Sequence, residues 1–99
     1  MYLGWFFCTV AYSRADIETA TELIDHCSYV VFAEEGDYLF GYMHFSEPRD
    51  KEYVRDLLPD TYGVFESDSE TSSAVLFVKR AYGWTEYGTI PEGVVDSVV

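Results

Sequence analysis

Basic side chains are scarce in this sequence. Six lysines and arginines stand against 18 aspartates and glutamates, which gives a formal net charge of -12 at pH 7. A surface of that sign is repelled by a phosphate backbone, so the composition argues against direct binding of nucleic acid. Three bases and three acids balance within residues 49–58, and the acidic excess therefore lies elsewhere in the chain.

Cysteines are also few, and their spacing is uninformative. Cys8 and Cys27 form no C-x-x-C motif and have no histidine pair beside them. Such spacing predicts neither a disulfide framework nor a zinc site. We expect two buried thiols in a reducing compartment, with no metal and no cofactor.

Long hydrophobic runs are absent. The apolar stretch 3–11 covers only nine residues, too few to cross a bilayer. It lacks a basic segment before it and a small-residue cleavage site after it. We therefore predict a buried first strand, no membrane partner and an intracellular protein.

Linkers, internal repeats and low-complexity blocks are missing as well, which predicts one domain over residues 1–99. Hydrophobic residues make up 48% and aromatic residues 18% of the chain, enough to build a core. The short apolar tail 92–99 has no predicted placement.

Hydrophobic periodicity and turn residues predict the elements. Strands are expected over 3–10, 29–34, 39–45, 62–66 and 84–89, and helices over 13–26, 48–58 and 68–81. Pro48 is expected in the first turn of the second helix. This order predicts an α+β fold: a ferredoxin-like antiparallel sheet (βαββαβ) with an extra helix and an edge strand.

Three segments carry a family resemblance: YVVFAEEG at 29–36, GYMHF at 41–45 and WTEYGTIP at 84–91. Together they resemble the replication (Rep) endonuclease domain of circoviruses and related circular single-stranded DNA viruses. The resemblance covers about residues 5–91. It implies an HUH-endonuclease-like fold, a viral source and the cytoplasm or nucleus of the host cell.

The residues that the family uses for metal binding are largely replaced. The resemblance places its acidic ligand at Glu35, but its His and Gln ligands fall on Tyr38 and Phe40, which do not coordinate a divalent metal at neutral pH. Strand alternation puts Tyr38, Phe40, Tyr42 and His44 on one face. We expect that face to be aromatic, with His44 a sheet histidine too far from Glu35 to share a metal.

The nucleophile is replaced too. The family's Tyr-x-x-Lys falls on residues 76–79, where Lys79 is retained and Leu76 stands at the tyrosine position. The family's first motif falls on 7–11, with Val10 and Ala11 at its two asparagines. We therefore predict no enzyme activity. The hydroxyl-rich segment 67–73 is compatible with phosphorylation at Ser67 or Ser69, or with a solvated helix start.

Three hypotheses follow for the function. The first is a DNA mimic, in which carboxylates on a rigid fold bind a basic DNA-binding protein of host or virus and block its DNA site. The second is an inactive domain that regulates an active Rep by pairing with it, and the third is a Rep domain that still binds single strands. A homodimer is compatible with each. The predicted partner-binding residues form three acidic clusters: Glu18, Glu22 and Asp25; Glu34, Glu35 and Asp37; Glu66, Asp68 and Glu70.

Overall fold

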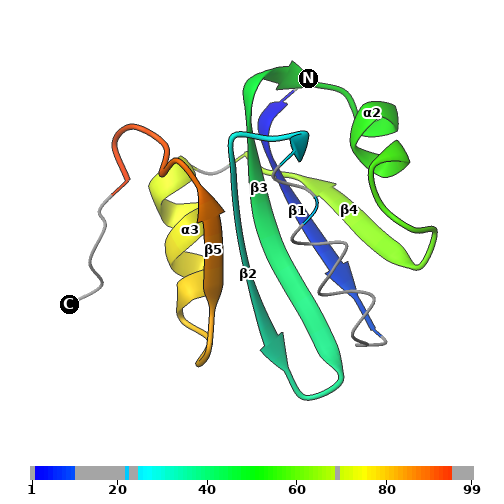
Figure 1. Cartoon of the computed structure of the whole chain (residues 1–99), viewed down its shortest axis with the longest axis vertical. Helices are drawn as coiled ribbons and strands as arrows, with labels where there is room; N and C mark the ends of the chain where they lie inside the picture. Colours follow the sequence, from blue (N-terminus) through cyan, green and yellow to red (C-terminus); the bar gives the residue numbers. More distant parts are fainter. Residues whose placement is uncertain (1, 11–21, 23–24, 69, 95–99) are drawn as a thin grey trace.

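The computed structural model describes residues 2–10, 22, 25–68 and 70–94. These residues form one antiparallel sheet with the strand order β4-β1-β3-β2-β5 (Figure 1). The strands are β1 (Tyr2–Thr9), β2 (Tyr29–Glu35), β3 (Tyr38–Arg49), β4 (Tyr62–Glu66) and β5 (Thr85–Gly88). The described helices are α2 (Lys51–Asp56) and α3 (Thr71–Lys79). The fold is α+β with an open five-stranded antiparallel sheet, an arrangement compatible with a ferredoxin-like fold.

All five predicted strands are confirmed, with small changes at their ends. The predicted helix 13–26 lies mostly outside the described residues. The helix predicted over 68–81 is shorter and begins at Thr71. A two-residue turn joins β2 to β3, and Gly36 adopts φ +62° there, the left-handed region that glycine enters without steric cost.

The prediction that Pro48 opens the second helix is wrong. Pro48 lies in β3, and α2 begins at Lys51. Beyond His44 the β2 partner has ended, so this part of β3 pairs only with β1, and a proline is tolerated on such an edge. The helix starts later because the Asp50 carboxylate accepts a hydrogen bond from the Tyr53 amide at 2.9 Å and caps it.

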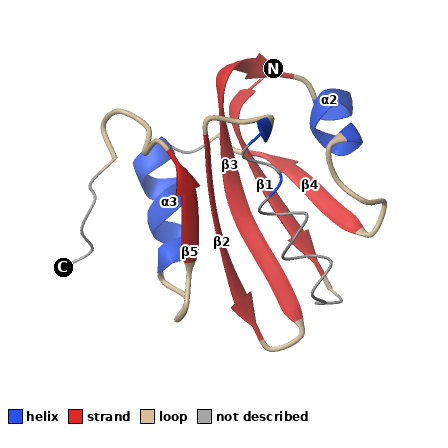
Figure 2. Cartoon of the chain, viewed as in Figure 1, coloured by secondary structure: helices blue, strands red, loops and turns tan. Residues whose placement is uncertain are grey.

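The sheet carries a separate apolar cluster on each face, because side chains alternate along every strand. One cluster contains α2 residue Val54 and the strand residues Trp5, Phe7, Val30, Phe32, Leu39, Met43, Phe45, Tyr62 and Val64. The other lies under α3 and contains Tyr29, Val31, Ala33, Tyr42, Ala74, Val75 and Val78. The two described helices therefore cover opposite faces of the sheet (Figure 2).

Gly41 sits at the centre of β3, where the backbone is too closely packed for a side chain. A Cβ at this position would lie 2.5 Å from the carbonyl oxygen of Val31 and 2.6 Å from Cζ of Phe7. The glycine thus lets the Phe7 ring fill the middle of the sheet.

Candidate partner-binding surface

The aromatic face predicted for β3 is present. Phe40 and Tyr42 belong to the cluster under α3, while Tyr38 at the strand's start is 55% exposed. The Tyr42 hydroxyl lies 2.8 Å from Nδ1 of His44. Burial raises the pKa of Tyr42 and lowers the pKa of His44, so both are neutral near pH 7. The two groups therefore form a neutral hydrogen bond on this face of the sheet.

The register of the β2–β3 hairpin separates Glu35 from His44. Glu35 pairs with Tyr38 beside the turn, whereas His44 pairs with Tyr29 at the other end. Six residues of strand correspond to about 20 Å, so the two side chains do not converge on one ion. Among the described residues, no group of three or more His, Cys, Asp or Glu side chains is arranged to hold a metal.

Lys79 is engaged in an ion pair away from the β1–β4 half of the sheet. Its Nζ lies 2.9 Å from the Glu86 carboxylate, and only 1% of the lysine side chain is exposed. The Tyr29 hydroxyl donates to the same carboxylate at 2.6 Å, and Nζ lies 4.3 Å from the centre of the Trp84 ring. Burial alone raises the pKa of Glu86, but hydrogen bonds from Tyr29 and Lys79, with the lysine charge, lower it below its ordinary value.

This ion pair links the last turn of α3 to β5 and was missed at the level of sequence. The signal available was Glu86 in the middle of an aromatic strand, where an inward carboxylate needs a cation. The sequence interpretation instead assigned Lys79 the position of the Rep lysine. At the neighbouring nucleophile position, the Leu76 side chain is partly exposed and carries no reactive group.

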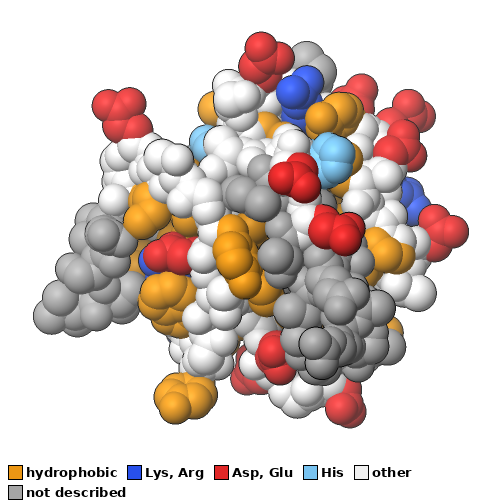
Figure 3. All heavy atoms as spheres, viewed as in Figure 1, with side chains coloured by type: hydrophobic (Ala, Val, Ile, Leu, Met, Phe, Trp, Pro, Cys, Tyr) orange, Lys and Arg blue, Asp and Glu red, His pale blue; other side chains and the backbone are white. Residues whose placement is uncertain are grey.

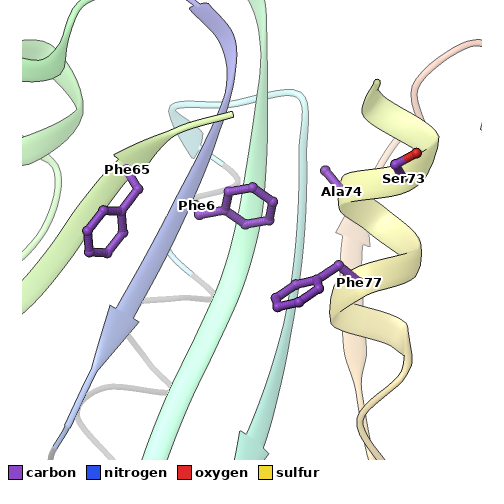
Figure 4. Close-up of a pocket in the computed structure, with 5 residues that line it drawn as sticks. All are labelled: Phe6, Phe65, Ser73, Ala74 and Phe77. Carbon is purple, nitrogen blue, oxygen red and sulfur yellow. The ribbon is translucent and has the colours of Figure 1, made fainter. Parts of the chain in front are cut away.

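A hollow opens beside α3 over β1 and β4 (Figure 4). A cavity of about 430 Å³ is lined by Phe6, Phe65, Ser73, Ala74 and Phe77. A second, of about 370 Å³, shares the three phenylalanines and continues to Phe40 and Glu35. We call this continuous hollow the aromatic groove. Figure 4 shows Phe65 on β4 and Phe77 on α3 on either side of Phe6.

The groove is shaped by exposed aromatic rings. Phe65 and Phe77 are each 55% exposed. The Phe77 ring makes edge contacts with Phe6 and Phe40, at centroid distances of 5.9 and 6.3 Å. Sequence analysis singled out Phe40 on the face of β3 but missed Phe6, Phe65 and Phe77, because their meeting depends on where α3 packs.

The predicted acidic residues are exposed wherever the structure describes them. Glu18 lies outside the described residues, and the other eight are exposed: Glu22, Asp25, Glu34, Glu35, Asp37, Glu66, Asp68 and Glu70. Across the described ranges 14 acidic side chains are exposed, against three exposed basic ones, Lys51, Arg55 and Arg80. In the view of Figure 3, acidic side chains are spread around the outline and basic ones are few.

The acidic clusters do not form a single patch. Glu34 and Glu35 are neighbours on β2 and point to opposite faces of the sheet. Glu66 pairs with Trp5 and shares the α2 face, whereas Phe65 faces the groove. β4 ends at Glu66, so Asp68 and Glu70 lie beyond the strand.

Neither cysteine forms a disulfide, and Cys27 is buried. Burial raises the pKa of Cys27 to about 11, with a smaller opposing effect from its hydrogen bond to the Tyr29 carbonyl. None of the helices within the described part of the chain is long and apolar enough to cross a membrane.

No protein-family model matches the chain, and a search of curated proteins finds no match. The resemblance to Rep endonuclease domains therefore depends on the sequence motifs alone and stays a prediction.

Proposed function

We propose that the chain is a catalytically inactive, Rep-like viral domain that binds a basic DNA-binding protein and blocks its DNA site. The observation that carries the proposal is the surface charge: 14 exposed acids against three exposed bases among the described residues. A basic DNA site and this surface attract each other at long range, which accelerates encounter and makes the complex salt-sensitive.

The way the acids are held supports competition with DNA. Glu34 and Glu35 end β2 and Asp37 lies in the two-residue turn to β3, so their backbone is already fixed before a partner arrives. Binding then orders side chains but little backbone, which lowers its entropic cost. Carboxylates held on a fixed backbone can in this way occupy the basic sites of a partner that normally bind DNA phosphates.

The remnants of the Rep motifs support loss of nuclease chemistry. Tyr38 and Phe40 stand at the ligand positions, and Leu76 at the nucleophile position. Lys79 is paired with Glu86 at 2.9 Å. The HUH-like part of the proposal is supported by α3, which packs on the face of β3 that carries Phe40 and Tyr42.

The test is capture of partners from host and viral extracts at low and moderate salt, followed by competition with labelled DNA. Charge reversal to Lys is made at Glu35 and Asp37 in one variant and at Asp68 and Glu70 in another, with circular dichroism to confirm folding. We expect captured proteins to bind DNA, to release it when the chain is added, and to lose the chain when one cluster is reversed. Capture of a Rep through a salt-insensitive contact, with neither cluster involved, would instead support the regulatory pairing.

A further inference from the structure

Within the described residues, the face of the sheet beneath α3 is covered over only about half of its width. The helix packs on β2 and β3, where Tyr29, Val31 and Tyr42 are buried. On the other half, Phe65 of β4 stays 55% exposed and faces the aromatic groove. A monomeric surface that leaves clustered phenylalanine rings in water loses hydrophobic stabilisation, and such patches mark binding sites.

The width of the groove suits one helix. Strands lie about 4.8 Å apart, so the strip over β1 and β4 is about 10 Å wide. An α-helix with its side chains has a diameter of about 10 Å. The groove begins at Ser73, and an adjoining cavity that shares Glu35, Phe40 and Phe77 with it reaches Arg80. Along α3 this is a length of about 11 Å, or two helical turns. It opens on the face of the sheet and not on its edge, which favours a helix over an added strand.

The charges at the ends of the groove define the partner further. Glu35 lines the end of the groove beside the β2–β3 turn, and an adjoining cavity there is lined by Glu35 and Asp37. At the other end, exposed Asp68 and Glu70 precede the first turn of α3. Arg80 is the one basic side chain among the described residues that line these cavities. The groove is thus an apolar strip with acidic ends.

We infer that the aromatic groove binds an amphipathic helix of a protein partner, with apolar side chains on the face toward Phe6, Phe65 and Phe77. Lys or Arg residues at both ends of that helix meet the acids at the ends of the groove. This inference rests on the proposed function, because it specifies the segment by which a basic DNA-binding protein is held. The mode is a helix in a groove, read by apolar anchors at i, i+3 or i+4, and i+7.

Two other occupants fit the charges less well. Single-stranded DNA stacks on aromatic side chains, but it requires a cationic groove for its phosphates. The described residues that line these cavities include Glu35 and Asp37 against one cation, Arg80. A second copy of the chain would bring the same acidic ends against these acids, and like charges in an interface oppose association. Both alternatives give distinct outcomes in the experiment below.

The experiment uses the full chain and a fluorescent synthetic peptide of about four helical turns. The peptide carries leucines at i, i+4 and i+7 and lysines at both ends, and binding is followed by fluorescence anisotropy. The matched control peptide has glutamates in place of the lysines. We expect the lysine-ended peptide to bind and the glutamate-ended peptide to bind at least tenfold more weakly at low salt.

Two protein variants locate the site. Phe65→Thr removes an exposed groove ring while keeping a strand-forming residue, and should weaken binding about tenfold. Its control is Tyr82→Thr, since Tyr82 is 99% exposed and lines none of the groove cavities; it should leave affinity within about twofold. The double variant Glu35→Gln with Asp37→Asn should reduce the salt dependence of peptide binding. Its control is the double variant Glu47→Gln with Glu92→Gln, which neutralises two acids elsewhere on the surface.

Several results would overturn the inference: no binding of the lysine-ended peptide, equal effects of Phe65→Thr and Tyr82→Thr, binding of a single-stranded oligonucleotide in place of the peptide, or self-association that Phe65→Thr abolishes. The failure of the proposed function is separable. If a captured basic protein binds Phe65→Thr as tightly as the parent chain, the groove is refuted and DNA mimicry stands. If the peptide binds the groove but captured proteins keep their DNA, the groove stands and DNA mimicry is refuted.

Discussion

The buried ion pair of Lys79 and Glu86 makes an asymmetric prediction about stability. The lysine side chain is 1% exposed and the glutamate side chain 24% exposed, at an Nζ to carboxylate distance of 2.9 Å. Removing the glutamate charge leaves a buried ammonium unpaired, whereas removing the lysine leaves a carboxylate that water and Tyr29 still solvate. We therefore expect Glu86→Gln to cost about 3 kcal/mol in the free energy of unfolding.

Lys79→Met should cost less, about 1 kcal/mol, because the methionine keeps the packing under Trp84 and the carboxylate keeps a donor. In thermal unfolding, a loss of 3 kcal/mol corresponds to a fall in Tm of roughly 12 °C or more for a domain of this size. The double variant Lys79→Met with Glu86→Gln should lose less stability than the sum of the two single losses, because neither charge is then left unpaired.

The assay is urea unfolding followed by tryptophan fluorescence, with Glu92→Gln as the exposed-acid control. The pKa of Glu86 is lowered in the folded state, so the contribution of this group is complete above its ordinary value of 4.5 and is lost as pH falls through the lower folded value. Glu86→Gln should therefore lose less stability than the parent chain on acidification. Equal costs for the two single variants, or a cost for Glu86→Gln below about 0.5 kcal/mol, would refute the reasoning.

Three further outcomes are expected. The pKa of Cys27 is raised from 9.0 to about 11, so this group contributes stability that is complete below pH 9.0 and is lost as pH rises through about 11. Cys27→Ala should therefore reduce the loss of unfolding free energy at alkaline pH. An unchanged dependence of the unfolding free energy on pH would contradict this prediction. Gly41→Ala should destabilise by about 2 kcal/mol or more because its Cβ meets the Val31 carbonyl at 2.5 Å, while Gly63→Ala, whose nearest contact is 3.2 Å to a Phe65 ring carbon, should cost less. With Mg²⁺ or Mn²⁺ and single-stranded DNA, the chain should form no covalent adduct, and an adduct band on a denaturing gel would disprove this.

Local sequence signals were sufficient for the strands and insufficient for the helix boundaries. The unbroken apolar run 29–33 of β2 reflects burial against both faces of the sheet, so it could be interpreted directly as a strand. The start of α2 depended on a competition that composition does not reveal. Pro48 suits a helix's first turn, but the Asp50 side chain caps the helix two residues later while β3 continues beside β1.

The candidate site also has parts that could be predicted from sequence and parts that could not. Exposure of the acidic residues followed from their charge alone, because an unpaired carboxylate is rarely buried. The directions in which these side chains point did not follow from charge, since Glu34 and Glu35 are adjacent in sequence and point to opposite faces. The aromatic groove was hidden because Phe6, Phe65 and Phe77 belong to three elements, and only the packing of α3 brings their rings together.

The position of β1 has a consequence for synthesis of the chain. β1 begins at Tyr2, yet it lies between β3 and β4, with Phe7 paired to Gly41 on one side and Val64 on the other. As the ribosome releases this aromatic segment, neither neighbour exists, and β4 begins more than 50 residues after β1 ends. Pairings between such distant residues are slow, and unpaired strand edges favour aggregation while they persist. The nascent chain should therefore depend on chaperones until β4 emerges.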